Sequence, residues 1–389
     1  MSLRPLFAIA LVIACNGSKS DGTGTADLPS VTDADTDADT DSDSDTDTDS
    51  DSDTDTDTDT DTDTSDTGTF TGDPVEYTVE TCNNSWSAPP GGELCEVSGD
   101  PATATHILIQ GDILGDITTY EAGEILIERG VNGLIECVGC DCSSQAPSDV
   151  LTVTCPDGVV SPGLINGHDH ITYGLMSPAS WGDERYDHRH DWRRGKRGHT
   201  SLDSFSDRAH TDILYNEMRM LFGGATSIAG SVGGVNSAGL MRNLDDSETN
   251  EGLGGWEVGY ETFPLNDIDG DLYADGCENY FPDGDYVLSD RIYLPHIAEG
   301  IDPEAQNEFH CLSGSGGNGS EDLIADNTSI IHGIGLTADD VKVVSDRGAH
   351  LLWSPRSNVS LYGETAPVVM YDHMGVPIAL GTDWTPSGS

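Results

Sequence analysis

The sequence is poor in basic residues. Its 389 residues include only 16 lysines and arginines, against 70 aspartates and glutamates, and its formal net charge is −54. Without the seventeen aspartates between Asp33 and Asp66 the charge is still −37. Proteins that bind nucleic acid need a basic surface, because much of their affinity comes from contacts with phosphates. The composition therefore argues against a nucleic-acid partner.

Long hydrophobic runs are also missing. After the N-terminus, no apolar stretch approaches the ~20 residues that a membrane-spanning helix needs. Residues 1–15 combine a positive start at Arg4, a short apolar run and a cysteine after the small residue Ala14, which resembles a bacterial lipobox. We expect residues 1–15 to be a lipoprotein signal peptide, with Cys15 as the lipidated residue. An ordinary signal peptide cleaved nearby is the alternative.

Residues 16–74 contain an almost pure repeat of Asp-Thr and Asp-Ser pairs. Such a segment repels itself and cannot bury a core, so it predicts a disordered, solvated linker. Together with the lipobox, it predicts an exported protein that a lipid anchors to the outer membrane or the cell surface.

Eight cysteines remain beyond Cys15. An even number in an exported protein favours disulfides, although the pairing cannot be derived from the sequence. The spacing of Cys137, Cys140 and Cys142 also permits a zinc knuckle, but it lacks a matching second pair. The eight are Cys82, Cys95, Cys137, Cys140, Cys142, Cys155, Cys277 and Cys311.

The rest of the chain divides by its pattern at about residue 160. Residues 75–160 contain short strand-like runs, at 105–109, 124–127 and 150–153, and predict a small β-domain. Residues 161–389 alternate strands and helices, which predicts a parallel sheet, and eight such units would close a TIM barrel. Helices are expected at 211–222, 337–347 and 366–374, and strands at 225–229, 291–295, 329–332, 350–353 and 377–380.

Polar residues recur just after the apolar strands. His168 and His170 follow the first of them, and His296, His332 and Asp383 follow later ones. In a barrel the C-terminal ends of the strands converge on one mouth, where catalytic groups gather. Residues two apart on a strand point to the same side, so His168 and His170 can bind one cation. A third histidine and an aspartate complete a ligand set with a position open for water.

Five segments together resemble the amidohydrolase superfamily, in its deaminase- and chlorohydrolase-like branch. The resemblance extends from about residue 100 to the last residue, and its motifs are specific as a set. It implies an α/β fold, a TIM-type (β/α)8 barrel with a small β-sandwich domain formed by the N-terminal flank. The segments are Pro162–His170, His296–Glu299, His332–Gly333, Ser354–Asn358 and Gly381–Asp383.

The resemblance also implies a role for each of these residues. Glu299 is expected to move a proton between the attacking water and the leaving nitrogen. His332 is expected to hydrogen-bond the water or the developing oxyanion, and Asp383 to accept a proton from the water. One divalent metal, zinc or iron, is expected to activate the water. Its implied ligands are His168, His170, His296 and Asp383.

Members of this superfamily with two metals bridge them with a carboxylated lysine on the fourth strand. This chain has no lysine between Lys196 and Lys342. The segment expected to form that strand offers only Glu257 and Glu261 as acidic side chains. A single metal is therefore favoured, with a glutamate-bridged pair as the alternative.

Two loops have more than one interpretation. The segment 185–199 is rich in arginine and histidine, and either contacts an anionic or polar substrate or forms internal ion pairs. The acids from Asp267 to Glu278 stand at positions 1, 3, 5, 9 and 12 of a calcium loop, but Leu272 replaces the expected glycine. An acidic turn tied by Cys277 is favoured there over a calcium site.

The sequence thus predicts a metal-dependent hydrolase that acts on non-peptide carbon–nitrogen bonds of a small molecule. The alternative is a non-catalytic surface-binding or calcium-dependent structural lipoprotein on the same barrel. The chain stops at Ser389, six residues after Asp383, whereas superfamily members continue with a final helix and strands. We therefore expect a barrel that is incomplete at its C-terminus.

Overall fold

The computed structural model describes residues 76–130, 133–180, 182–230, 240–246, 258–282 and 291–388, and the backbone of residues 9–10. The chain divides into two units, one of Met1–Cys15 with Val75–Ser389 and the other of Asn16–Pro74. The expected lipidation site at Cys15 and the linker 16–74 lie outside the described residues, as does the signal peptide except for two residues. Within the described part, no helix is long and apolar enough to cross a membrane.

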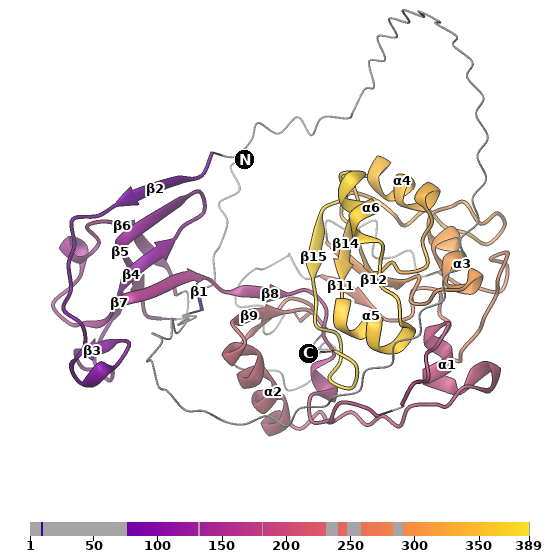
Figure 1. Ribbon diagram of the computed structural model, residues 1–389, viewed down its shortest axis with the longest axis horizontal. Coiled ribbons are helices and arrows are strands. Elements are labelled where there is room, and N and C mark those ends of the chain that lie inside the picture. The colour runs from indigo at the N-terminus through magenta and orange to yellow at the C-terminus, as the bar shows by residue number, and fades with distance from the viewer. Residues whose placement is uncertain are drawn as a thin grey trace, which may run out of the picture. The chain divides into compact units, whose positions relative to one another are not determined.

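The N-terminal flank forms one seven-stranded sheet (Figure 1). Its strand order is β1-β7-β4-β5-β2, with β3 paired to β7 and β6 paired to β5. The strands predicted at 124–127 and 150–153 lie within the longer β5 and β7, and the one predicted at 105–109 overlaps β4 except at residue 105. All described strands of this segment belong to one sheet, so the two facing sheets of a sandwich are not distinguished. The strands are β1 (Ile9–Ala10), β2 (Thr78–Thr81), β3 (Glu96–Ser98), β4 (His106–Leu114), β5 (Thr118–Glu128), β6 (Ile135–Gly139) and β7 (Val150–Pro162).

Disulfides reinforce this sheet. Its six cysteines form the bridges Cys82–Cys140, Cys95–Cys155 and Cys137–Cys142. Because Cys137 and Cys142 are bonded to each other, and Cys140 to Cys82, the segment is not a zinc knuckle. The prediction of disulfides is confirmed.

The rest of the described chain contains eight parallel strands in two sheets. One sheet has the order β10-β9-β8 and the other β11-β12-β13-β14-β15, which confirms the α/β class. Backbone hydrogen bonds lie near both seams. One joins Val258 N to Leu244 O at 2.9 Å, and at the other seam Gly167 N donates to Leu380 O at 3.3 Å and Asp383 N to His168 O at 2.9 Å. Barrel closure by a continuous ladder is not detected among the described strands. The strands are β8 (Leu164–Asn166), β9 (Ala225–Ile228), β10 (Arg242–Asn243), β11 (Gly259–Glu261), β12 (Tyr293–Ile297), β13 (Ser329–His332), β14 (His350–Trp353) and β15 (Ile378–Leu380).

The helices between these strands begin at recognisable capping residues. The Asp302 side chain accepts a hydrogen bond from Ala305 N at 2.8 Å, and Pro303 opens α3. Thr337 and Asp340 form a reciprocal capping box at the start of α4. The helices are α1 (Arg189–Arg194), α2 (His210–Phe222), α3 (Pro303–Leu312), α4 (Ala338–Asp346), α5 (Pro355–Tyr362) and α6 (Val368–His373), with 3-10 turns η1 (Pro90–Gly92), η2 (Ser143–Gln145), η3 (Ile171–Tyr173) and η4 (Lys196–Gly198).

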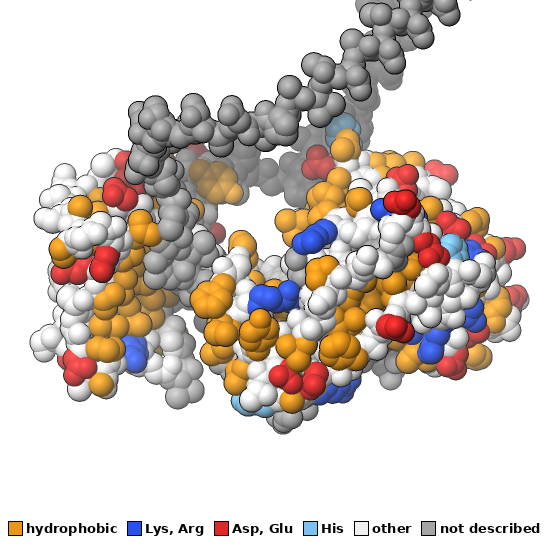
Figure 2. Space-filling view, turned by 60° about the horizontal axis from the view of Figure 1, so that its bottom comes forward, with side chains coloured by type: hydrophobic (Ala, Val, Ile, Leu, Met, Phe, Trp, Pro, Cys, Tyr) orange, Lys and Arg blue, Asp and Glu red, His pale blue; other side chains and the backbone are white. Residues whose placement is uncertain are grey.

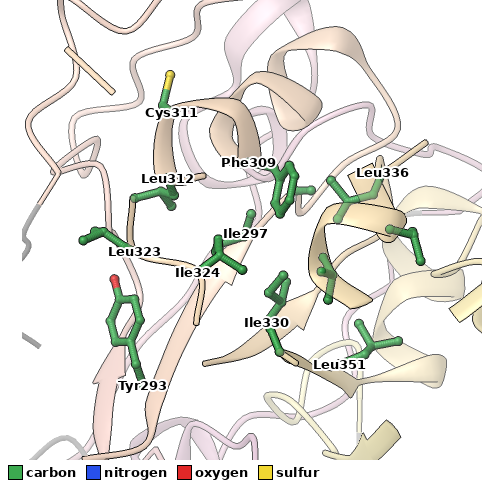
Figure 3. Close-up of a cluster of buried hydrophobic side chains, with 14 of the residues drawn as sticks. Tyr293, Ile297, Phe309, Cys311, Leu312, Leu323, Ile324, Ile330, Leu336 and Leu351 are labelled. Carbon is green, nitrogen blue, oxygen red and sulfur yellow. The ribbon is translucent and has the colours of Figure 1, made fainter. Parts of the chain in front are cut away.

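The largest hydrophobic core lies between strands β12 to β14 and the helices that follow them (Figure 3). Tyr293 and Ile297 of β12, Ile330 of β13 and Phe309 of α3 all belong to it and are almost fully buried. Every residue of β12 is buried, as expected for a strand covered on both faces. This packing fixes the strands whose C-terminal ends carry the polar residues.

Part of the surface is hydrophobic. Figure 2 shows broad areas of hydrophobic side chains, with charged side chains scattered between them, on the face in view. Leu164 and Ile165 of β8, Phe222 of α2 and Leu380 of β15 are among the exposed large hydrophobic residues. The two strands at one seam between the parallel sheets therefore present apolar side chains to solvent.

Candidate metal centre and active site

The structure brings the predicted site residues together at the C-terminal ends of the parallel strands. The His168 ring centroid lies 4.8 Å from that of His296 and 4.9 Å from that of His332. The centroids of His170 and His296 are 5.4 Å apart. Asp383, beyond β15, places Oδ1 3.5 Å from His168 Nε2 and 3.4 Å from His170 Nε2.

The imidazole nitrogens that face one another are poorly paired within the protein. His168 Nε2 and His170 Nε2 lie 3.4 Å apart, and His296 Nε2 is buried without a hydrogen-bond partner. A buried polar atom without a partner is costly, and a bound cation would satisfy it. The ligand atoms of His168, His170 and Asp383 lie within 4.8 Å of one another. This donor set fits one divalent metal, and imidazole with carboxylate is typical of zinc.

The far side of each ring is held by a neighbour. His168 Nδ1 lies 2.7 Å from Ser354 Oγ, and His296 Nδ1 lies 3.0 Å from the backbone oxygen of Glu261. A carbonyl can only accept, so His296 Nδ1 carries the proton and its Nε2 keeps a free lone pair. Contacts of this kind orient metal ligands.

The electrostatic environment keeps these histidines neutral. Burial lowers the pKa of His168, His170 and His296, and neighbouring histidines lower it further. In His170 the Asp383 charge opposes this effect. Neutral imidazoles are the form that ligates metals, so the cluster is ready to bind a cation at neutral pH.

Glu299 lies beside the cluster as a buried carboxyl. Its Oε2 is 3.5 Å from His332 Nε2, and the Tyr362 hydroxyl donates a hydrogen bond to its Oε1 at 2.8 Å. Trp192 Nε1 in turn donates to the Tyr362 oxygen at 2.8 Å. Burial raises the pKa of Glu299, and the charge of Asp383 adds to this. A positioned carboxyl with a raised pKa is suited to proton transfer.

Two site residues have left-handed backbone conformations. His332 has a φ of 75° and Asp383 a φ of 59°. For side chains of this size the conformation costs of order 1–3 kcal/mol and persists only where the surroundings hold it. Asp383 is held by Trp384 N, which donates to its Oδ1 at 2.7 Å, and by Ser357 Oγ, which donates to its Oδ2 at 2.5 Å.

Asp169, between the two first-strand histidines, does not join the cluster. Its Oδ2 accepts hydrogen bonds from Thr382 Oγ1 at 2.6 Å and from Asn166 Nδ2 at 3.2 Å. Asn166 Nδ2 also contacts Thr382 Oγ1 at 2.7 Å. Asp169 therefore ties the first strand to the last one.

Several residues that support the site carry no clear signal in the sequence. Tyr362 contacts Glu299, and Asn358 Oδ1 lies 3.1 Å from His332 Nδ1. Ser354, Ser357 and Asn358 belong to a segment that the resemblance had included without assigning roles. The run of polar residues after β14 was the available signal, whereas nothing local to Tyr362 marked it.

A cavity of about 400 Å³ opens over the cluster. His170, His296, Glu299, His332 and Asp383 line it together with several aromatic and basic side chains. The basic ones are Arg189, Arg193, Arg194 and Arg208, and the aromatic ones are Tyr173, Trp192, Phe263 and Trp384.

The arginine-rich segment forms internal ion pairs and also lines the cavity. Arg197 forms internal ion pairs with Asp191 at 2.6 Å and with Asp302 at 2.7 Å. Arg193 and Arg194 instead line the cavity. Its histidines contact acids: His188 Nε2 lies 3.3 Å from Glu308 Oε1, His190 Nε2 2.8 Å from Asp267 Oδ2, and His199 Nδ1 3.2 Å from Glu184 Oε1.

The calcium site between Asp267 and Glu278 is not supported. The carboxylate of Asp267 is buried and pairs with Arg189 Nη2 at 2.6 Å, so the first ligand of the expected loop points into the protein. Among the described residues, the loop acids form no cluster that could hold a cation. The favoured alternative, a turn tied by Cys277, is confirmed by the Cys277–Cys311 disulfide.

The question of a second metal rests on β11. Glu257 lies outside the described residues. The Glu261 side chain accepts a hydrogen bond from Phe263 N at 3.0 Å, while its backbone oxygen contacts His296. A single metal remains the prediction.

Comparisons with known proteins point in the same direction. No family model matches the chain. A 5-methylthioadenosine/S-adenosylhomocysteine deaminase of Halobacterium salinarum is 23% identical over 312 residues, which cover 72% of this chain and 68% of the relative. The deaminase of the same name from Teredinibacter turnerae is 33% identical over 67 residues, 17% of this chain and 15% of the relative. These relatives support the resemblance to the amidohydrolase superfamily.

Similar solved structures include two hydrolases. The triazine hydrolase of Arthrobacter aurescens is 18% identical, with a TM-score of 0.46, covering 73% of this chain and 72% of that one. An adenosine deaminase from Xanthomonas campestris with bound zinc is 16% identical, with a TM-score of 0.42, covering 72% and 70%.

Proposed function

We propose that this chain is a metal-dependent hydrolase of the amidohydrolase superfamily that cleaves non-peptide carbon–nitrogen bonds. The observation that carries the proposal is a pair of ligand triads that share His168, one with His170 and Asp383 and the other with His296 and His332, with His296 Nε2 left without a partner. His168, His170, His296 and Asp383 would hold one divalent metal, zinc first and iron second, which would supply an activated water.

The protein's own groups provide the remaining steps. Glu299 takes a proton from the attacking water and delivers it to the nitrogen that leaves, so its carboxyl is restored at the end of the cycle. The Tyr362 hydroxyl fixes the orientation of that carboxyl. His332 hydrogen-bonds the oxygen on which charge develops. Asp383 accepts the second proton of the water as the carbonyl forms and passes it to the ring nitrogen of the product, so that this carboxylate is also restored.

The relatives favour one reaction among those that such a site supports. The curated proteins that this chain resembles are named as deaminases. We infer that the substrate is an aminated heterocycle, from which water displaces ammonia. Opening of a cyclic amide and removal of chloride use nearly the same groups and are the alternatives to test in the same screen.

Metal analysis tests the proposal directly. Purified full-length protein, loaded with zinc and freed of excess by gel filtration, is expected to retain about one metal per chain, and His168→Ala to retain much less. His373→Ala changes an exposed histidine outside the cluster and is expected to retain metal like the wild type. The proposal would be refuted if the wild type held no metal, or if His168→Ala held as much metal as the wild type.

A second variant separates catalysis from metal binding. Glu299→Gln keeps the size of the side chain but cannot move the proton, so it is expected to keep its metal and to lose turnover. A screen of aminated heterocycles, cyclic amides and N-acyl compounds supplies the assay. Undiminished turnover in Glu299→Gln would refute the role given to this residue.

We further propose that a closed barrel and lipid anchoring complete this description. Eight strands in chain order, with backbone hydrogen bonds near both seams, support closure. The eight paired cysteines support export, because disulfides form in oxidising compartments. Labelling with a radioactive fatty acid tests the anchor: label is expected on the wild type and absent from Cys15→Ser.

A further inference from the structure

The cavity over the metal centre gathers positive charge in a strongly acidic protein. Four of the sixteen lysines and arginines of the chain line it, although the formal charge of the whole chain is −54. Two acids of the centre, Glu299 and Asp383, also face the cavity. The question is which of the arginines are already neutralised.

Arg189 is neutralised by the protein itself. Its Nη2 lies 2.6 Å from Asp267 Oδ2 and 3.0 Å from Glu308 Oε1, and its Nη1 donates to Thr262 O at 2.7 Å. All three charged side chains are almost completely buried. Two carboxylates for one guanidinium leave no positive charge there for a ligand.

Arg193 and Arg194 have different surroundings. Arg193 contacts His190 Nδ1 at 2.8 Å and donates to Ile268 O at 3.3 Å, and Arg194 donates to the same oxygen at 2.9 Å. Burial lowers the pKa of His190 to about 4, so this histidine is neutral. Within the described residues, neither guanidinium has a carboxylate at salt-bridge distance. Both therefore lack a salt-bridge partner among the described residues, although the charges of Asp267 and Glu299 act on Arg193 from a greater distance.

The geometry fixes one of these charges at the cavity wall. The Arg193 guanidinium stacks over the Phe263 ring, 4.2 Å from its centroid, which limits its motion. Burial lowers the pKa of Arg193 to about 10, and the charges of Arg189 and Arg194 contribute. Arg194 places a second guanidinium close by, and an anion placed between the two would be attracted by both.

The aromatic side chains of the same cavity suit a flat ring. The rings of Trp192 and Trp384 lie 4.9 Å apart, and Tyr173 meets Trp384 edge-on at 5.7 Å. A cavity of about 400 Å³ has room for a heterocycle with one substituent. One molecule in this cavity could therefore contact the metal centre, the aromatic side chains and the two arginines Arg193 and Arg194 at the same time.

We propose that Arg193 and Arg194 form an anion subsite, and that the substrate is an aminated heterocycle with a carboxylate or phosphate group. The ring lies among the aromatic side chains, with its amino carbon at the metal and its acidic group at the two guanidinium groups. This inference rests on the proposed hydrolase function for the reaction, but not for the binding of the anion.

Matched compounds test the subsite. A panel of aminated heterocycles is prepared, each as the carboxylate, the phosphate ester and the neutral carboxamide, and turnover is measured with zinc-loaded full-length protein. The anionic members are expected to have kcat/KM values about 10- to 100-fold higher, as charge-assisted hydrogen bonds provide. Whether carboxylate or phosphate is preferred identifies the natural group.

Variants assign the preference to these arginines. Arg193→Met with Arg194→Met is expected to bring the ratio of kcat/KM for the anions to kcat/KM for the carboxamides down to about one. Arg194 is more exposed than Arg193, so the single variant Arg194→Met is the test to use if the double variant does not fold. It is expected to lose part of the preference for anions. Lys196→Met removes one positive charge from the same segment outside the cavity and is expected to keep the preference.

Measurements of binding distinguish failure of the hydrolase proposal from failure of the anion-subsite proposal. If no compound turns over, the hydrolase proposal fails, and calorimetric titration of the same carboxylates and carboxamides decides on the subsite. Tighter binding of the carboxylates, lost in the double variant, supports it. Equal kcat/KM or equal affinity for acid and amide, or an acid preference that survives in the double variant, overturns it.

Discussion

Arg189→Met is expected to destabilise the fold by about 3–5 kcal/mol at pH 7, the range found when one partner of a buried charge network is removed. Arg189, Asp267 and Glu308 are each about 1% exposed, with the guanidinium 2.6 and 3.0 Å from the two carboxylates. Methionine fills a similar volume but leaves both acids buried without their cation. The penalty is therefore one of charge and not of packing.

The penalty should depend on pH with a definite sign. Burial alone would raise the pKa of Asp267 and of Glu308, but the Arg189 charge and hydrogen bonds from histidines hold both below their usual values. In the wild type this stabilisation is present at neutral pH and is lost as the pH falls below about 4, through the folded-state pKa values. Without Arg189 the two pKa values rise above those of the unfolded chain, so the deficit of the variant shrinks between pH 7 and pH 5.

Urea denaturation at pH 7 and at pH 5 measures both effects. Lys342→Met is the control, because Lys342 pairs with Asp346 on the surface and should change stability by less than about 0.5 kcal/mol. A loss below about 1 kcal/mol for Arg189→Met, or a loss that is equal at the two pH values, would show that the network is not the charge balance described here.

Two further substitutions probe the centre. Ser354→Ala removes the contact to Nδ1 of His168, a proposed metal ligand. Metal affinity, measured by competition with a chelator, is expected to fall about 10- to 100-fold while the fold is kept. Unchanged affinity would mean that Ser354 does not orient His168. Tyr362→Phe removes the hydrogen bond to Glu299, and kcat is expected to fall about 10-fold with unchanged metal content. An altered metal content would place Tyr362 in metal binding instead.

The clustering of the residues at strand ends could be predicted from two general rules. Side chains alternate along a strand, and the C-terminal ends of parallel strands in a barrel meet at one mouth. His168 and His170 had to point to one side, and the ends of parallel strands had to meet, so His296, His332 and Asp383 could be assigned to the same place before the structure. The strands β13 and β14 were predicted with the bounds that the structure shows.

The errors and omissions depend on contacts between distant parts of the chain. The spacing of the acids from Asp267 to Glu278 permits a calcium loop, but the carboxylate of Asp267 forms a salt bridge with Arg189, 78 residues away. Tyr362 reaches Glu299 across 63 residues, and only the placement of α5 brings them together. Helix α3 was missed although Asp302 and Pro303 form a recognisable start, because its apolar spacing is weak.

The tie between Asn166 and Thr382 joins positions that are 216 residues apart, at opposite ends of the catalytic segment. Contacts of such separation are slow to form during folding, because a long loop must close first. Asp383 follows the last strand, so the ligand set is complete only when the last strand has docked beside the first. Tight metal binding would then occur only at the end of folding, and a metal ion present earlier would find an incomplete set of ligands.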